Sequence, residues 1–97
     1  MLAEYRGHLK TIWSLSFNKS GYFFLSGSAD KTIKLWATDD SIAQRVYVGH
    51  QDDVTKVDFL KNPDLMVSAS EDRTIRIWNT LTTQCLNVYN ILFRFLN

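Results

Sequence analysis

The chain has 97 residues, of which 45% are hydrophobic and 22% are charged, a balance that is typical of a soluble globular protein. A chain of this length buries only roughly 60–65% of its unfolded surface, so we expect one small domain or part of a larger one. The formal net charge of +1 offers no basic field to a phosphate backbone, which argues against direct binding of nucleic acid.

Cysteine content and apolar runs narrow the class of protein further. Cys85 is the only cysteine, which excludes an internal disulfide, and we expect it to be an inert, half-buried strand residue. No run approaches the ~18 apolar residues that span a bilayer, and residues 1–6 lack the apolar core of a signal peptide. The sequence therefore predicts an intracellular protein without a membrane partner.

A repeat of 42 residues organises the chain. Gly7-His8 returns as Gly49-His50, and the two copies align without a gap as residues 7–48 and 49–90. Thirteen aligned positions are identical, and apolar, turn and aromatic positions stay in phase over the whole period. A unit that repeats in full within so short a chain predicts two copies of one structural unit.

Each copy contains four short runs with the pattern of a strand, and neither copy shows a helical pattern. In the first run, alternation places Trp13, Leu15 and Phe17 on one face, and the second run is almost continuously apolar, as in a strand covered on both faces. The expected strands are 12–17, 22–25, 32–37 and 44–48, followed by 54–59, 65–68, 74–79 and 84–89. The pattern predicts an all-β fold of two four-stranded antiparallel sheets.

The two ends do not complete a further copy. Residues 1–6 resemble the run before Gly49, with Tyr5 in the place of Tyr47, and we expect them to form the outer strand of a preceding sheet. A third Gly-His pair is due at residues 91–92, but residues 91–97 form a non-repeating apolar tail instead. This loss of the period favours a truncated chain or a fragment of a longer one.

A set of polar and aromatic residues recurs in both copies. It comprises His8, Ser26, Ser28, Asp30 and Trp36, and then His50, Ser68, Ser70, Asp72 and Trp78. Serine, histidine and aspartate are the parts of a hydrolase triad, but a triad is needed once, and no serine here lies in a G-x-S-x-G elbow. We favour a structural interpretation, in which imidazole, hydroxyl, carboxylate and indole N–H form a buried hydrogen-bond relay in each sheet.

No metal ion or cofactor is expected. His50, Asp52 and Asp53 lie close together in the sequence, but no second histidine is near them. The first copy also lacks ligands at the corresponding positions, so a solvated loop is the better interpretation.

These residues resemble a known family. Gly-His, about two dozen residues, Ser-x-Ser-x-Asp-x-Thr-Ile-Lys-Leu-Trp and a further strand form the pattern of WD repeats, which build β-propellers from four-stranded blades. The resemblance covers roughly residues 5–89, although Trp36-Ala37 and Trp78-Asn79 replace the usual Trp-Asp. It implies two WD-repeat blades of an incomplete β-propeller, serving as a scaffold and not as an enzyme.

A finer likeness points to one group of WD-repeat proteins. The run Leu35–Asp39, with segments 11–14 and 21–27, is similar to a middle repeat of the TFIID subunit 5 family. The likeness continues at Arg45, Gly49, His50, Asp53, Val54, Phe59 and Asn62. The resemblance implies a nuclear scaffold in the initiation of transcription by RNA polymerase II.

Loops on rigid blades are the expected sites for binding other proteins, namely subunits of a multiprotein complex such as the general transcription machinery. The candidate partner-binding residues are Lys10, Trp13, Ala29, Lys31, Asp52, Glu71 and Arg73. Trp13 could serve as an aromatic anchor or simply pack with Leu15 and Phe17. For the whole chain, the alternatives are an adaptor of another complex and a non-functional truncated remnant.

Overall fold

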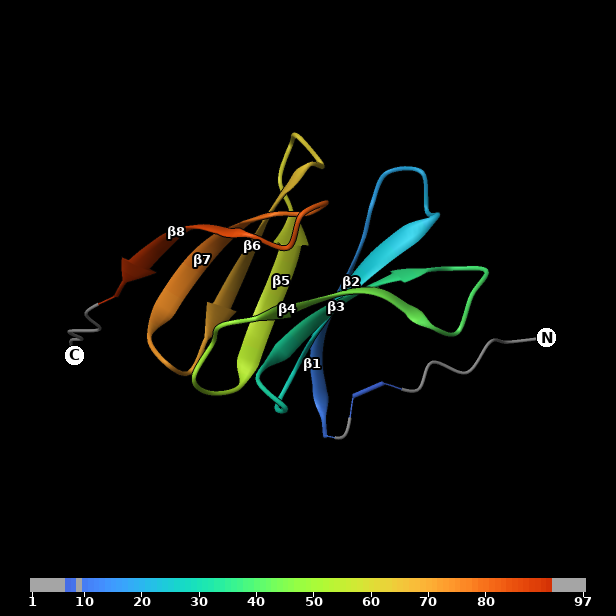
Figure 1. Cartoon of the computed structure of the whole chain (residues 1–97). Helices are drawn as coiled ribbons and strands as arrows, with labels where there is room; N and C mark the ends of the chain where they lie inside the picture. The colour runs from blue at the N-terminus through green and yellow to red at the C-terminus, as the bar shows by residue number, and fades with distance from the viewer. Residues whose placement is uncertain (1–6, 9, 92–97) are drawn as a thin grey trace.

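The computed structural model describes residues 7, 8 and 10–91, and all regular structure in this part of the chain is β-strand (Figure 1). The first sheet contains β1 (Ile12–Phe17), β2 (Phe23–Ser28), β3 (Thr32–Ala37) and β4 (Ala43–Val48). The second sheet contains β5 (Val54–Phe59), β6 (Leu65–Ser70), β7 (Thr74–Asn79) and β8 (Cys85–Asn90). Neighbouring strands in each sheet pair antiparallel in chain order, which confirms the expected all-β architecture.

The second strand of each sheet extends beyond the apolar run that predicted it. β2 continues through Gly27 to Ser28, because Gly27 pairs with Ser14 of β1 on one side and with Ile33 of β3 on the other. Backbone pairing on both sides keeps these small and polar residues in the strand, although their side chains carry no strand signal. β6 reaches Ser70 in the same way.

A bulge in β1 lies beside Trp13. The register between β1 and β2 shifts between Ile12 and Ser14. Trp13, Leu15 and Phe17 are exposed, whereas Ser14 and Ser16 between them are half-buried, so burial follows the expected alternation from Trp13 onward. Trp13, Ser14 and Ser16 all make hydrogen bonds to residues of the second sheet or of the loop that leads into it. The role of Trp13, as an anchor or packed with Leu15 and Phe17, stays a prediction.

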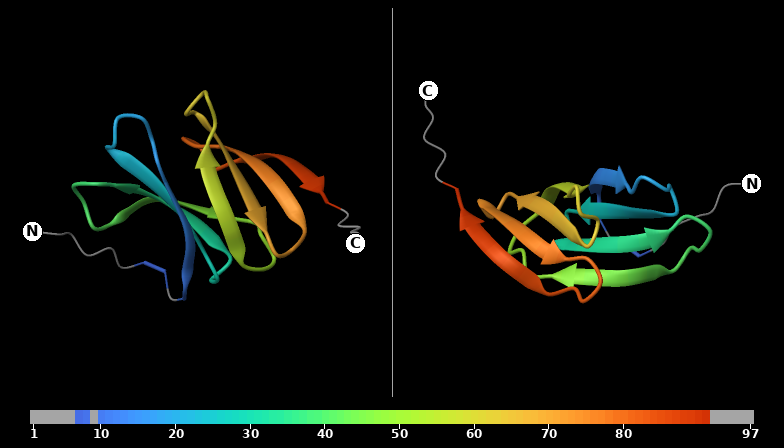
Figure 2. Two further views of the ribbon diagram at one scale, coloured as in Figure 1. Left: turned by 180° about the vertical axis from the view of Figure 1, so that it is seen from behind. Right: turned by 90° about the horizontal axis from the view of Figure 1, so that it is seen from above.

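The core lies between the two sheets, which pack face to face with β5 against β1 and β2 (Figures 1 and 2). Its buried side chains are Leu25, Ile33, Leu35 and Tyr47 from the first sheet, and Val54, Val57, Met66 and Trp78 from the second. Cys85 packs against this cluster from the start of β8 and is half-buried. The core is thus a junction between repeats, so the sheets stabilise each other.

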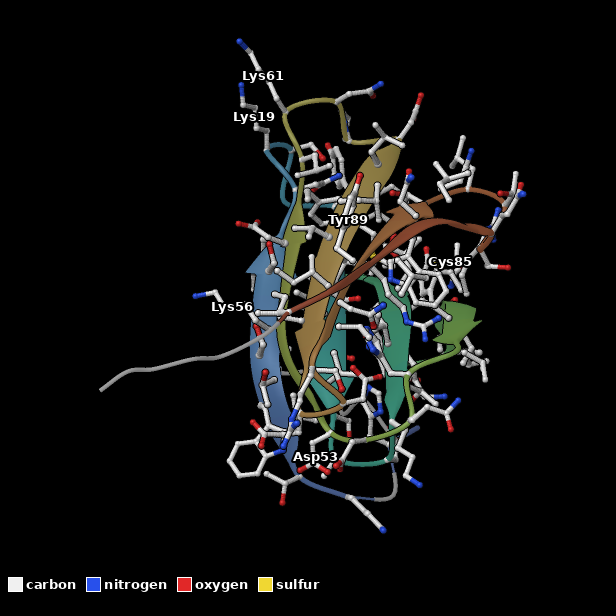
Figure 3. All side chains as sticks on the ribbon, turned by 90° about the vertical axis from the view of Figure 1, so that its left-hand side faces the viewer. Lys19, Asp53, Lys56, Lys61, Cys85 and Tyr89 are labelled. Carbon is white, nitrogen blue, oxygen red and sulfur yellow. The ribbon has the colours of Figure 1, made fainter. Side chains whose placement is uncertain are left out.

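The connections between strands gather at two opposite ends of the molecule. The segments 18–22, 38–42, 60–64 and 80–84 form what we call the hairpin end. The turns 29–31 and 71–73, with the segments that precede β1 and β5, form the histidine end. Figure 3 shows Lys19 and Lys61 at the hairpin end and Asp53 at the histidine end.

Each sheet has one face at the junction and one outer face. The outer face of each sheet is equivalent to the face that the other sheet buries at the junction, and it is exposed. Val57 of β5 is 2% exposed, whereas Leu15, its equivalent in β1, is 56% exposed. Tyr47 is 1% exposed, whereas Tyr89, its equivalent in β8, is 53% exposed. Both outer faces therefore present apolar side chains to solvent.

Some expectations about the chain's ends lie outside the described residues. These are the outer strand expected at residues 1–6 and the apolar tail beyond Ile91, which itself follows β8 without regular structure. The boundaries of the repeats at residues 7–48 and 49–90 stay predictions. In the part of the chain that the structure describes, no helix has the length and apolarity to cross a membrane.

Candidate functional site

A chain of hydrogen bonds links histidine, serine, aspartate and tryptophan in the first sheet. Nδ1 of His8 lies 2.7 Å from Oδ2 of Asp30, and its Nε2 lies 2.6 Å from Oγ of Ser26. The indole Nε1–H of Trp36 donates to the same Ser26 oxygen at 2.8 Å. β2 and β3 supply the serine and tryptophan, the turn between them supplies the aspartate, and the segment before β1 brings in the histidine.

The donors and acceptors along this chain of bonds match one another. A carboxylate only accepts, so Nδ1–H of His8 donates to Asp30. With Nε2 as an acceptor, the hydroxyl of Ser26 donates to it and accepts the indole hydrogen of Trp36. This order satisfies each of these polar atoms.

The second sheet repeats this relay. His50 contacts Asp72 at 2.8 Å through Nδ1 and Ser68 at 2.6 Å through Nε2, and Trp78 donates to Ser68 at 2.8 Å. Both histidine side chains are 1% exposed, so the relays lie beneath the surface.

The other two serines hold the turns and lie beside the relays. Ser28 Oγ donates to the carbonyl oxygen of Thr11 at 2.8 Å and accepts the backbone N–H of Asp30 at 3.1 Å. Ser70 Oγ likewise donates to the carbonyl oxygen of Asp52 at 3.2 Å and accepts the backbone N–H of Asp72 at 3.1 Å. Each of these serines thus joins its turn to the incoming loop.

A threonine in each sheet completes the set and was missed from the sequence. Thr32 donates both its hydroxyl, at 2.5 Å, and its backbone N–H, at 2.9 Å, to Oδ1 of Asp30. Burial raises the pKa of Asp30, but the bonds from Thr32 and His8 outweigh it and lower the pKa overall. The identity of Thr32 and Thr74 in the two repeats was the signal that could have identified them.

Burial and hydrogen bonding also shift both titrating groups of the second relay. Loss of solvent lowers the pKa of His50, an effect that Asp72 partly offsets and Arg76 strengthens. Burial raises the pKa of Asp72, but its hydrogen bonds act in the opposite direction and prevail. The donors, in order of effect, are the Thr74 hydroxyl, the backbone N–H of Gln51, His50 and the backbone N–H of Thr74. The pKa of Asp72 therefore lies well below its usual range.

Glycine precedes each histidine because the chain passes directly over the indole. A Cβ at Gly49 would lie 2.9 Å from Nη1 of Arg76 and 3.2 Å from Cη2 of Trp78. A Cβ at Gly7 would lie 2.9 Å from Cη2 of Trp36. A larger residue would lift the chain and draw the histidine away from its serine.

The geometry of the relays is that of a structural element, because a substrate has no access to the relay serines. Ser26 and Ser68 are each 1% exposed, and the hydroxyl of each already bonds both an imidazole and an indole. A triad nucleophile must reach a substrate carbonyl beside an oxyanion hole. Among residues 7, 8 and 10–91, no group of three or more histidine, cysteine or acidic side chains is placed to hold a metal ion.

Six of the candidate partner-binding residues gather at the histidine end. They are Lys10, Ala29 and Lys31 from the first sheet, and Asp52, Glu71 and Arg73 from the second. The backbone N–H of Ala29 donates to the carbonyl oxygen of Thr11 at 2.8 Å. The N–H of Glu71 donates to the carbonyl oxygen of Asp53 at 2.9 Å. Each turn is thereby held beside the loop that precedes the first strand of its sheet.

Two cationic residues occupy the left-handed backbone region in these turns. Lys31 has a φ of 74° and Arg73 a φ of 68°, whereas such conformations favour glycine. Each follows the relay aspartate, and its N–H donates to the carbonyl oxygen of Ser28 or Ser70. Both turns therefore place a long basic side chain at a strained position on one end of the molecule.

Trp13 lies near this end but on the side of the second sheet. Its indole Nε1–H donates to Oδ2 of Asp53 at 2.9 Å, and the residue is 54% exposed. An exposed tryptophan fixed by one hydrogen bond keeps much of its ring free for contact.

Polar contacts across the junction were not predicted from the sequence. The phenol of Tyr47 donates to the carbonyl oxygen of Thr80 at 2.5 Å, and Nε of Arg45 donates to that of Leu81 at 2.7 Å. Burial raises the pKa of Tyr47 to about 12, although Arg45 acts against this shift. These partners are far apart in the chain, and only the identity of Tyr47 and Tyr89 in the two repeats marked the tyrosine.

Comparison with known proteins supports the WD-repeat resemblance. The model of the family described as WD domain, G-beta repeat matches residues 1–37 and 42–79. The crystal structure of RRP9 WD40 repeats superposes with a TM-score of 0.80 at 22% sequence identity, over 88% of this chain and 26% of that one. At this identity the likeness shows the fold alone: two blades of a β-propeller that this chain does not close.

Short stretches also match curated proteins. Eukaryotic translation initiation factor 3 subunit I of Meyerozyma guilliermondii is 42% identical over 38 residues, which are 39% of this chain and 11% of that protein. Nuclear distribution protein PAC1 of Candida tropicalis is 47% identical over 36 residues, or 37% of this chain and 7% of that protein. Elongator complex protein 2 of Arabidopsis thaliana is 35% identical over 40 residues, or 41% of this chain and 5% of that protein.

By name, two of these relatives are parts of different assemblies, eukaryotic translation initiation factor 3 and the Elongator complex, and the chain spans only a small share of each of the three relatives. The finer likeness to TFIID subunit 5 stays a prediction. The repeated Gly-His and Trp positions, the two four-stranded sheets and the match of the family model over most of the chain agree with one another. The chain therefore belongs to the WD40 family of WD domain, G-beta repeat proteins.

Proposed function

We propose that the chain is a protein-interaction scaffold that binds its partner through the histidine end and catalyses no reaction. The observation that carries this proposal is the strained backbone of Lys31 and Arg73 at equivalent turns. A left-handed conformation costs a non-glycine residue about 1–2 kcal/mol, and such strain clusters where side chains have a function. Rigid relays beneath the turns hold both cations in place.

The charges at the histidine end indicate the kind of partner surface that fits. Lys10 and Lys31 lie on the first sheet, whereas Asp52 and Glu71 accompany Arg73 on the second. A partner with an acidic patch facing the first sheet and a mixed patch facing the second would match these charges. The exposed Trp13 supplies apolar contact area near their boundary.

Affinity purification with the full chain tests this proposal. The double variant Lys31→Glu and Arg73→Glu should lose at least nine-tenths of a partner that the unchanged chain retains. Lys56→Glu, on β5 and away from the turns, is the matched charge reversal and should retain that partner (Figure 3). Equal retention by both variants would place the binding surface elsewhere.

The absence of catalysis is tested with a fluorophosphonate probe. A hydrolase would label one of Ser26 and Ser68 and spare the equivalent residue in the other repeat. The buried hydroxyls lead us to expect no labelling of either serine. Labelling that stops on substitution of its relay histidine would contradict the scaffold proposal.

A more specific candidate is a scaffold of the TFIID subunit 5 type, active in the nucleus with the general transcription machinery. The run Leu35–Asp39 favours it, whereas the short matches to other assemblies favour an adaptor elsewhere. Identifying the proteins that depend on Lys31 and Arg73 in the purification distinguishes the two. Co-purification of translation factors without transcription factors would contradict the TFIID assignment.

A further inference from the structure

Two hollows open at the hairpin end, where the sheets meet. One has a volume of ≈ 370 Å³ and the other of ≈ 480 Å³. Asn18, Phe59 and Pro63 line both, so the two hollows adjoin each other, and we call them together the junction groove. Volumes of this size are typical of sites that accept ligands.

The junction groove has apolar walls in both of its parts. Phe23, Leu35 and Leu81 line the smaller part, and Phe17 and Leu60 line the larger one. Phe23, Leu81 and Phe17 are exposed to solvent. An apolar side chain that entered the groove would cover this surface and gain about 25 cal/mol for each Å² removed from water.

Positive charge gathers at the larger part of the groove. Lys19 and Lys61 occupy the same position in the two repeats and both line this part, and Figure 3 shows their side chains at the same end of the molecule. No carboxylate of the described residues forms an ion pair with either ammonium group. Asp58, which also lines this part, accepts the hydroxyl hydrogen of Ser16 at 2.8 Å.

We propose that the junction groove binds an extended acidic peptide with an apolar anchor. The anchor enters the smaller part, and its neighbouring carboxylates lie at the ammonium groups of Lys19 and Lys61. A peptide presents apolar and charged groups one after another along its chain. This order matches an apolar hollow that adjoins a hollow lined by two lysines. This site is separate from the proposed histidine-end surface and lies at the opposite end of the strands.

The test is a titration of the ¹⁵N-labelled full chain with the acetylated and amidated peptide Glu-Glu-Phe-Glu-Glu, followed by amide chemical shifts. We expect shift changes in residues 17–23 and 59–64. Peptides with glutamine in place of glutamate, or alanine in place of phenylalanine, should bind at least tenfold more weakly. The difference in affinity between the glutamate and glutamine peptides should also shrink as the salt concentration is raised from 50 to 500 mM.

Charge-reversal variants of the chain test where the peptide binds. Lys19→Glu with Lys61→Glu should weaken binding at least tenfold, and both side chains lie at the exposed tips of hairpins, where folding does not depend on them. Lys31→Glu with Arg73→Glu should change the affinity less than twofold, so failure here is distinct from failure of the histidine-end surface. Equal binding of the glutamate and glutamine peptides, or shift changes confined to residues 29–31 and 71–73, would overturn the proposal.

Discussion

Replacing Ser68 with alanine removes the atom at which the second relay joins its histidine to its tryptophan. Ser68 Oγ accepts the indole hydrogen of Trp78 at 2.8 Å and donates to Nε2 of His50 at 2.6 Å. Both partners are buried, so water cannot readily replace the hydroxyl. Each of the two stranded polar groups costs about 1–3 kcal/mol, which gives a loss of about 2–6 kcal/mol in the free energy of unfolding. A domain of this size has about 5–15 kcal/mol in total.

Urea unfolding followed by tryptophan fluorescence measures this loss. Ser70→Ala is the matched control, because its hydroxyl makes two longer bonds, to the carbonyl oxygen of Asp52 at 3.2 Å and from the backbone N–H of Asp72 at 3.1 Å, outside the relay. It should cost less than Ser68→Ala. Adding Trp78→Phe to Ser68→Ala removes the stranded donor, so the double variant should lose at least about 1 kcal/mol less than the sum of the single losses. Equal losses for the two serine variants, or strict additivity in the double variant, would refute the reasoning.

Three further changes probe the junction, the titrating groups and the turns. In Gly27→Ala the new Cβ would lie 2.8 Å from Cγ1 of Val54, so urea unfolding should show a loss of about 1–3 kcal/mol in the free energy of unfolding. Adding Val54→Ala should partly relieve this loss. If Gly27→Ala costs the same with valine as with alanine at position 54, the close contact is contradicted. Burial lowers the pKa of His50, so the unfolded state binds its proton first and stability should fall as pH drops below about 6.5. The hydrogen bonds to Asp72 lower its pKa, so stability should fall again below about 3.8, where Asp72 of the unfolded chain becomes protonated. A melting temperature that rises on acidification would contradict these signs. Lys31 has a φ of 74°, so the Lys31→Gly variant should be more stable than the Lys31→Val variant by about 1–2 kcal/mol in thermal melts. The reverse order of stability would contradict the left-handed turn.

The regular part of the fold followed from the sequence because burial and pairing obey local periods. β1, β3, β5 and β7 have the bounds that alternation predicted. The 42-residue repeat also predicted which histidine belongs with which serine, aspartate and tryptophan, because a feature needed in every sheet recurs at one spacing. The hydrogen bonds of His8 and His50 join the residues that were grouped in this way.

The rest depended on tertiary geometry that no local pattern carries. The bulge between Ile12 and Ser14 shifts the register of β1 against β2, and it arises where β1 meets both β2 and the loop that leads into the second sheet. Thr32 was overlooked because threonine is ordinary at the start of a strand, and its role appears only when Asp30 is placed beside it. The junction groove combines Lys19 and Lys61, which alternation had no reason to bring together.

Long-range ¹H–¹⁵N spectroscopy of the imidazoles tests most directly whether these histidines are structural parts of a binding scaffold. We predict that both His8 and His50 carry a hydrogen on Nδ1, which bonds the relay aspartate, and that His50, whose pKa burial lowers, is neutral at pH 7 with Nε2 unprotonated. We also predict that the Nδ1 hydrogens exchange slowly with solvent. An Nε2–H tautomer, or Nδ1 hydrogens that exchange as freely as those of an exposed histidine, would contradict the relay on which the scaffold depends.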